Sequence, residues 1–232
     1  MYALTGVTKR YRKRQETVTA VDGVTLTIAD GEWLIVQGRT GHGKTTLLSI
    51  LGGLDRPTTG AVRFDGEDLA TLSESAVTRV RAASIGFIFQ TFNLVPTLSA
   101  AENVEAALVP LGMRAAERRA RVAGALDSVG LADRARHLPS ELSGGQQQRV
   151  GIARALVKEP KVLLADEPTG NLDEDTRDEI IGLLEKIWRE RELTVVLVTH
   201  DTDIADRATR VGVMRNGRLL LDGPEPAKET TR

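Results

Sequence analysis

The chain has 232 residues, with 31 Lys and Arg against 32 Asp and Glu and a formal net charge of -1. A chain of this length can bury a sizeable core and is expected to form one domain, and its balanced charge gives no reason to expect nucleic acid as a partner. There are no cysteines, which excludes disulfides, thiolate metal sites and thiol catalysis.

No stretch of the sequence has the character of a membrane span. The apolar runs fall well short of the roughly 18 residues that a span requires, and the N-terminal MYALTGVTKRYRKR lacks the apolar core of a signal peptide. We therefore expect a cytoplasmic protein. The three histidines lie too far apart in sequence for a familiar metal-ligand spacing.

The first predicted elements are two strands, a glycine-rich loop and a helix. VTLTI (residues 24–28) alternates apolar residues with Thr, and the apolar run EWLIVQ (residues 32–37) predicts a buried strand. The loop GRTGHGKT follows from Gly38, and the helix KTTLLSILGGL is expected to end at Gly52 and Gly53. A phosphate-binding loop requires a strand, a glycine loop and a helix in this order.

Later segments predict an outer antiparallel part, a helical part and further strands. RPTTGAVRFDGEDL (residues 56–69) indicates a turn, a short strand and an Asp-Gly turn, while residues 98–157 are rich in Ala, Arg and Glu and show no convincing strand. Strands return at KVLLAD (residues 161–166) and LTVVLVT (residues 193–199), with a helix at about residues 175–191 between them. Continuous apolar runs that alternate with helices indicate a mainly parallel sheet covered on both faces.

The expected fold is therefore α/β, with a mainly parallel core sheet, an antiparallel β subdomain and an inserted helical subdomain. Residues 1–97 and 158–223 would contain the core and antiparallel parts, and residues 98–157 the helical subdomain. A last hairpin is expected to turn at an Asn-Gly pair, and residues 224–232 to form a flexible tail.

GRTGHGKT fits the pattern G-x-x-x-x-G-K-[ST]. Glycines let successive backbone N–H groups curl around a phosphate at the positive end of the following helix. The Lys would bring a positive charge to the β- and γ-phosphates, and the first Thr a hydroxyl to Mg²⁺. The alternative, a glycine-rich turn that binds nothing, is disfavoured by the strand, spacing and Lys-Thr pair. The residues predicted to bind nucleotide here are Gly38, Arg39, Thr40, Gly41, His42, Gly43, Lys44, Thr45 and Thr46.

Polar side chains follow the ends of several apolar strands. Asp166 lies where ligands bind in open α/β sheets and can hold Mg²⁺ through a water, which would let Glu167 orient or deprotonate the attacking water. The alternative is an acidic pair that only caps the following turn. Gln90 and His200 end the strands IGFIFQ and VVLVTH, and by themselves both would be interpreted as structural residues. If these strands are parallel, their ends lie at the same edge of the sheet and would bring the four side chains together.

With GRTGHGKT, Gln90, LSGGQQQR, LLADEPTGNLD and VTH in this order, the sequence resembles the ATP-binding subunits of ABC transporters over essentially its whole length. IFQTFNLVPTLSAAENV and ADEPTGNLD are most similar to the branch with lipoprotein-release, macrolide-export and cell-division-type ATPases. The resemblance implies the ABC ATPase fold, ATP and Mg²⁺ as ligands, and hydrolysis of ATP coupled to transport. It also implies a homodimer that encloses the ATP.

The resemblance assigns roles residue by residue. Glu167 would be the general base, His200 the γ-phosphate switch and Lys44 a catalytic cation. Tyr11 would stack on adenine, although an ordinary strand-end tyrosine is the alternative, and Asp173 would lie at the subunit boundary. The Mg²⁺ ligands would be Thr45, Gln90 and, through water, Asp166. We name LSGGQQQR (residues 142–149) the signature segment; the residues in it that would bind the ATP of another copy are Ser143, Gly144, Gly145 and Gln146. A plain loop before a helix is the alternative.

Five positions depart from the family pattern. Thr40 and Thr45 stand where serine is common, and both keep the hydroxyl. Arg39 and His42 are unusual in the phosphate loop, and we expect the imidazole of His42 to face solvent while only its backbone N–H matters. A sharper alternative gives protonated His42 a phosphate or cross-dimer contact. Gly151 replaces a common alanine in the helix that the signature segment is expected to open, at a cost of about 1 kcal/mol in helix propensity.

The resemblance implies a motor that drives a separately encoded integral membrane permease and lies at the inner face of the cell membrane. Export or lipoprotein- or macrolide-type transport is the first hypothesis, and an ATP-driven signalling regulator of the cell-division type is the alternative. DNA-repair and translation ATPases usually carry long coiled coils or two cassettes, which are absent here. The membrane partner is expected near Gln90, with Phe92, Leu94 and Val95 as exposed apolar candidates and core packing as their alternative role.

Overall fold

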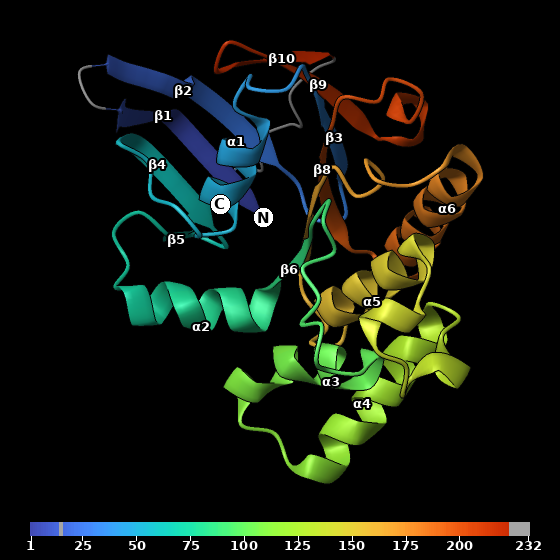
Figure 1. Cartoon of the computed structure of the whole chain (residues 1–232). Coiled ribbons are helices and arrows are strands. Elements are labelled where there is room, and N and C mark those ends of the chain that lie inside the picture. The colour runs from blue at the N-terminus through green and yellow to red at the C-terminus, as the bar shows by residue number, and fades with distance from the viewer. Residues whose placement is uncertain (14–15, 223–232) are drawn as a thin grey trace.

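A six-stranded sheet forms the centre of the protein, whose computed structural model describes residues 1–13 and 16–222 (Figure 1). The predicted tail at residues 224–232 lies outside the described residues. Neighbouring strands are parallel except for the last hairpin, whose two strands are antiparallel. In spatial order the strands are β10 (Arg218–Asp222), β9 (Arg210–Arg215), β3 (Trp33–Gln37), β8 (Thr194–Thr199), β7 (Val162–Asp166) and β6 (Ile85–Ile88).

A second sheet of four strands is antiparallel throughout and packs on the same core as the first helix. Helix α1 (Lys44–Leu51) buries Leu47 and Leu51 in a cluster that contains residues from both sheets, so it lies between them (Figure 1). The strands of this sheet, in spatial order, are β2 (Glu16–Ile28), β1 (Tyr2–Lys13), β4 (Thr59–Phe64) and β5 (Glu67–Asp68).

Helices cover the other face of the central sheet. Alternation along β3 explains the two layers, because Leu34 and Val36 belong to the cluster around α1, whereas Trp33 and Ile35 belong to the cluster on the helical side. The elements on that side are α3 (Ala100–Glu105), η1 (Ala106–Leu111), α4 (Ala115–Ser128), η2 (Ala132–Arg134), η3 (Pro139–Glu141), α5 (Gly144–Leu156), α6 (Glu174–Arg191) and η4 (Ala205–Arg207). None of the helices in the described residues is long and apolar enough to cross a membrane.

Strand β1 and helix α2 (Glu74–Ser84) are the longest elements that were not predicted from the sequence. Strand β1 lies in the polar N-terminal stretch, and α2 precedes β6. Helix α2 buries only Val77, so it has almost no apolar stripe, and its start is marked only by Ser73, whose hydroxyl accepts a hydrogen bond from the N–H of Ala76 at 3.3 Å. The predicted fold class is otherwise confirmed.

Candidate active site

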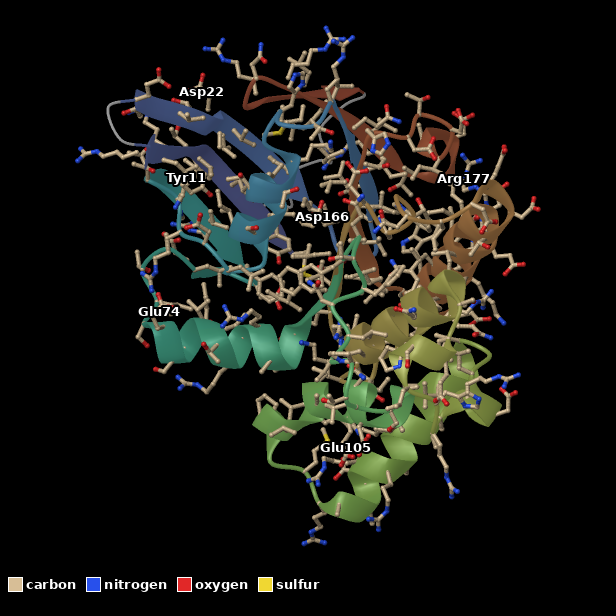
Figure 2. All side chains as sticks on the ribbon, viewed as in Figure 1. Tyr11, Asp22, Glu74, Glu105, Asp166 and Arg177 are labelled. Carbon is tan, nitrogen blue, oxygen red and sulfur yellow. The ribbon has the colours of Figure 1, made fainter. Side chains whose placement is uncertain are left out.

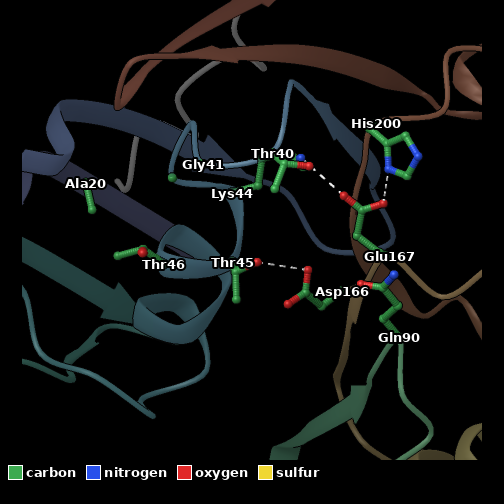
Figure 3. Close-up of a pocket in the computed structure, with 11 residues that line it drawn as sticks. Ala20, Thr40, Gly41, Lys44, Thr45, Thr46, Gln90, Asp166, Glu167 and His200 are labelled. Carbon is green, nitrogen blue, oxygen red and sulfur yellow. Dashed lines mark hydrogen bonds and ion pairs between the residues drawn. The ribbon is translucent and has the colours of Figure 1, made fainter. Parts of the chain in front are cut away.

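The ends of three neighbouring parallel strands meet at one edge of the central sheet. Strands β3, β7 and β8 end at Gln37, Asp166 and Thr199, and the strands pair in parallel in the order β3, β8, β7. A cavity of about 280 Å³ opens at this edge, beside the phosphate loop (Figure 3). The residues that line it are Ala20, Thr40, Gly41, Gly43, Lys44, Thr45, Thr46, Gln90, Asp166, Glu167 and His200.

The phosphate loop needs its glycines because of the backbone it packs against. Gly43 has a φ of 99°, and a Cβ there would lie 2.0 Å from the carbonyl oxygen of Ala20. A Cβ on Gly38 would similarly lie 2.5 Å from the carbonyl oxygen of Met214. Helix α1 begins at Lys44 without a side-chain cap among the described residues, so its first N–H groups are available to an anion in the cavity.

Lys44 and Glu167 form an ion pair inside the cavity. The Nζ of Lys44 lies 3.2 Å from Oε1 of Glu167 and donates to the carbonyl oxygen of Gly38 at 2.6 Å, and the Lys44 side chain is only 5% exposed. The other carboxylate oxygen of Glu167 contacts Nδ1 of His200. Glu167 has a φ of 47°, a strained conformation for a residue with a side chain. Because the carboxylate contacts Lys44 and His200, it faces the cavity and does not cap the following turn.

Thr45 and Asp166 lie side by side on the opposite wall, with Thr45 Oγ1 donating to Asp166 Oδ1 at 3.2 Å. Burial raises the pKa of Asp166 above its ordinary value, the charge of Glu167 adds to the rise, and the hydrogen bond from Thr45 offsets part of it. A cation nearby would offset the cost of burying this carboxylate. Gln90 lines the same cavity, and Mg²⁺ prefers oxygen ligands of these kinds, so the residues fit a magnesium ion.

The prediction that Gln90 ends a strand was wrong. Strand β6 ends at Ile88, opposite Ala165 of β7, and Gln90 lies in the turn that follows. Asn171 holds this turn, because its Nδ2 donates to the carbonyl oxygen of Gln90 at 3.0 Å. A Cβ on Gly170 would lie 2.8 Å from Nε2 of Gln90, so the Gln90 amide would have to shift if residue 170 had a side chain.

The expected orientation of His42 was also wrong. Its imidazole is half-buried, with Nδ1 3.2 Å from the carbonyl oxygen of Met214 on β9. Gly217, in the β9–β10 turn, donates its N–H to the carbonyl oxygen of His42 at 3.1 Å. The last hairpin thus offers the ring an acceptor on the protein, which explains why the ring is only partly exposed to solvent.

Several predicted site residues do not line the cavity: Gly38, Arg39 and His42 of the phosphate loop, Tyr11, residues 143–146 and Asp173. Tyr11 is 41% exposed on β1, and its hydroxyl donates to Asp55 Oδ2 at 2.7 Å. In the signature segment, Ser143 caps α5 by accepting from the N–H of Gln146 at 3.3 Å, and none of residues 143–146 lines the cavity. Asp173 caps α6 by accepting from the N–H of Thr176 at 3.0 Å.

Sequence reasoning missed Ala20 and Asp55. Ala20 is the extra residue of a β-bulge, because Lys9 pairs with Val21 of β2 while Arg10 pairs with Thr19. Nothing in the local sequence indicates this bulge. Asp55 follows the helix that begins at the phosphate loop, and only the fold brings it to Tyr11.

Comparisons with known proteins agree with this arrangement. Residues 21–170 match the family model described as ABC transporter. The chain is 47% identical to the lipoprotein-releasing system ATP-binding protein LolD of Geobacter metallireducens over 216 residues, which cover 93% of this chain and 96% of that protein. It is 45% identical to the macrolide export ATP-binding/permease protein MacB 2 of Aeromonas hydrophila, with 97% of this chain and 35% of that protein covered.

Solved structures give the same result. A dimeric, post-hydrolysis structure of the ATP-binding cassette MJ0796 bound to ADP and Pi superimposes with a TM-score of 0.89 at 42% identity, over 96% of this chain and 98% of that one. A second dimeric structure of MJ0796, described as a bacterial ABC transporter cassette, has a TM-score of 0.88 at 43% identity, over 94% and 96% of the two chains. The chain therefore belongs to the ABC transporter family, as an ATP-binding subunit and ATPase of the branch that includes lipoprotein-releasing and macrolide-export proteins.

Proposed function

We propose that two copies of this chain close around two molecules of ATP with Mg²⁺, and that closing and reopening drive a separate membrane protein in export of the lipoprotein-release or macrolide type. One observation carries the proposal. Residues of the phosphate loop line the cavity together with Asp166, Glu167 and His200, whereas the signature segment, including Ser143, lies outside it on the helical side. A second copy would supply the missing half. The MJ0796 cassette is described as a dimer bound to ADP and Pi, which supports the same arrangement here.

ATP would bind along α1. Its phosphates would accept hydrogen bonds from the first N–H groups of the helix and from Lys44, whose buried ammonium is already aimed into the cavity. Thr46, in the first turn of α1, would contact the α-phosphate. The adenine would stack on Tyr11, whose ring is partly exposed on β1.

Thr45, Gln90 and Asp166 would hold the magnesium ion, with Asp166 acting through a water. When bound, Mg²⁺ neutralises charge on the phosphate oxygens. Glu167 would accept the proton of the attacking water, because its carboxylate faces the cavity beside Lys44. His200 contacts that carboxylate and would also contact the γ-phosphate.

The start of α5 would bind the γ-phosphate of ATP held by the other copy, through Ser143, Gly144 and Gly145 and with Gln146 beside them. Asp173, which caps the neighbouring α6, would lie at the boundary between the two subunits. Loss of the γ-phosphate removes the contacts that are specific to the closed dimer, so hydrolysis favours opening.

The membrane partner would be an integral permease at the inner face of the cell membrane, which would make this chain a cytoplasmic, peripheral subunit. The MacB 2 relative joins an ATP-binding segment and a permease in one chain, which supports such a pairing. Val95 is the best candidate for the contact: it is 44% exposed, whereas Phe92 is half-buried and Leu94 packs against the helical core. Charge reversal at the neighbouring Glu102 would test the same surface less specifically, because the Glu102 carboxylate accepts a hydrogen bond from the N–H of Ser99 at 2.8 Å and so also stabilises the start of α3.

Co-purification tests this surface. Val95→Glu should lose the membrane subunit and keep ATP binding, while Leu220→Glu, at a 57% exposed leucine on β10, should keep both. Equal recovery of the membrane subunit by both variants would refute the contact. In the reconstituted complex, ATPase stimulation by a transported molecule supports transport, and its absence with intact coupling to the membrane subunit supports signalling.

A further inference from the structure

Three side chains form a closed set of contacts around the Tyr11 ring. The Tyr11 hydroxyl donates to Asp55 Oδ2 at 2.7 Å, and Lys9 Nζ lies 2.5 Å from Asp55 Oδ1. The same Lys9 ammonium lies over the ring of Tyr11, 4.9 Å from its centroid. The ring is therefore held at its hydroxyl and over one face, although the residue is 41% exposed.

The fold explains how these residues meet. Lys9 and Tyr11 are two positions apart on β1, so their side chains project from the same face of the strand. Asp55 lies beyond the end of α1, where its N–H donates to the carbonyl oxygen of Ser49 at 3.2 Å. Lys9 also donates to the carbonyl oxygen of Arg56 at 2.8 Å, so the strand is joined to the chain that leaves the helix.

The carboxylate of Asp55, at the centre of these contacts, is partly shielded from water. The side chains of Lys9 and Asp55 are 14% and 30% exposed. Partial burial pushes the pKa of Asp55 upward, but hydrogen bonds from Lys9, Tyr11 and the N–H of Arg56 outweigh burial and leave the pKa below its ordinary value. The carboxylate is thus ionised at neutral pH and accepts from both side chains, which makes these contacts stronger than those of an exposed pair.

The set is attached to the nucleotide cavity through α1. Thr46 lines the cavity, and although burial raises the pKa of Tyr11, the Thr46 side chain lies close enough to the Tyr11 hydroxyl to lower that pKa in part. Thr46 lies in the first turn of the helix and Asp55 beyond its end. Helix α1 therefore connects the phosphate loop to the residue that holds the Tyr11 hydroxyl; Tyr11 is labelled in Figure 2 and Thr46 in Figure 3. On the cavity side, the bulged residue Ala20 of β2 packs against Gly43.

We propose, on the basis of the ATP site proposed above, that Lys9 and Asp55 are positioning residues that fix the Tyr11 ring as a preformed platform for adenine. Lys9 covers one face, which leaves the other face to the base, and Asp55 fixes the rotation of the ring through its hydroxyl. A ring that is already fixed loses little conformational freedom when the base stacks on it, so ATP binds more tightly than it would on a mobile tyrosine.

A comparison of two ligands separates this role from general damage. ATP and inorganic tripolyphosphate share the phosphate chain, but only ATP has a base. We expect Asp55→Asn and Lys9→Met to weaken ATP binding by about three- to tenfold and to leave tripolyphosphate binding unchanged in the same Mg²⁺ buffer. Tyr11→Ala should weaken ATP binding at least as much, and Asp55→Asn should add nothing in the Tyr11→Ala background.

Conservative variants and matched controls sharpen the test. Lys9→Arg keeps a cation over the ring and should restore most of the affinity for ATP, while Tyr11→Phe keeps the ring, loses only the hydroxyl and should match Asp55→Asn. Asp65→Asn breaks another Asp–Lys pair, with Lys161 at 2.6 Å, and should bind both ligands like the wild type.

Each contrary result has a distinct meaning. If Tyr11→Ala weakens ATP binding but Asp55→Asn and Lys9→Met do not, the platform stands and the positioning role is wrong. If Asp55→Asn weakens both ligands equally, its role is structural and the proposal fails. If Tyr11→Ala binds ATP like the wild type, the platform and its positioning fail together while the ATP site stands. If the wild type binds neither ligand, the proposed function itself is wrong.

Discussion

Gly145 and Thr176 touch so closely that a Cβ on Gly145 would lie 2.5 Å from Cγ2 of Thr176. Thr176 also donates its hydroxyl to Asp173 Oδ2 at 2.8 Å. A Cβ on the neighbouring Gly144 would contact Leu172 at 3.4 Å. The signature segment and the turn at Asp173 are therefore packed together within one chain, and we expect them to approach a second copy as one surface.

Gly145→Ala should destabilise the protein by about 1–3 kcal/mol and lower ATP turnover, because the stiff β-branched Thr176 cannot turn away. The double variant Gly145→Ala/Thr176→Ser should recover most of both losses, since serine keeps the hydroxyl that bonds Asp173 and lacks Cγ2. Urea denaturation and steady-state ATPase rates measure the two effects. A single Gly145→Ala variant with wild-type stability and turnover would show that the contact relaxes without cost.

Gly151→Ala should stabilise the protein, whereas Gly145→Ala should destabilise it. This glycine lies within α5, and a Cβ there would meet Gln148 Oε1 and the carbonyl oxygen of Phe92 at 3.7 Å, which is ordinary contact. Alanine should stabilise the protein by about 0.5–1 kcal/mol, because glycine costs conformational entropy in a helix. A higher urea midpoint with an unchanged slope would support this expectation, and a lower midpoint would contradict it.

Ser143→Arg should separate binding from turnover. The residue lies outside the cavity, so the monomer should bind ATP within about twofold of wild type, while ATP turnover should fall by at least about 100-fold because the cross-subunit phosphate contact is blocked. Ser143→Ala controls for loss of the helix cap, worth about 1 kcal/mol, without adding bulk. If Ser143→Arg turns over ATP like the wild type, the segment does not contact the nucleotide of a second copy.

Lys158 should make stability depend on pH in the alkaline range. Burial, with the charge of Arg81 nearby, lowers the pKa of Lys158 from 10.5 to about 8. Between these values the unfolded chain binds more protons than the folded one, so the free energy of unfolding should gain a contribution that rises with pH from about 8 to 10.5.

Lys158→Met should remove this contribution, so the difference in unfolding free energy between wild type and variant should grow in favour of wild type as the pH rises. Urea denaturation at pH 7.5 and pH 9.5 measures that difference. Lys186→Met, at an exposed position, is the matched control and should show the same pH dependence as wild type. Parallel curves for wild type and Lys158→Met would contradict the prediction.

Much of the fold could be predicted because its signals are local. Apolar runs end at Gln37, Asp166 and Thr199, and the sheet brings these ends together as parallel pairing requires. The phosphate loop carries its own glycine pattern and lies where that pattern predicts. Helix α2 was missed because it packs through little more than Val77, so the sequence lacks the periodic apolar stripe that marks a helix.

The contacts missed at the site are long-range. His42 turns inward because Met214, from a hairpin at the far end of the chain, offers its carbonyl oxygen to the ring. Asp55 reaches Tyr11 across 44 residues of sequence. No local sequence pattern near Met214 or Asp55 predicts these two contacts, so they can be identified only in the folded chain.

The most direct test of the central claim uses Glu167→Gln, which keeps the shape of the side chain and removes its charge. This variant should bind ATP, lose turnover by about 100-fold or more, and double its mass in light scattering with ATP and Mg²⁺ but not with ADP. Adding Ser143→Arg to the same chain should return it to a monomer. A Glu167→Gln variant that hydrolyses ATP like the wild type, or that binds ATP and stays monomeric, would contradict the account.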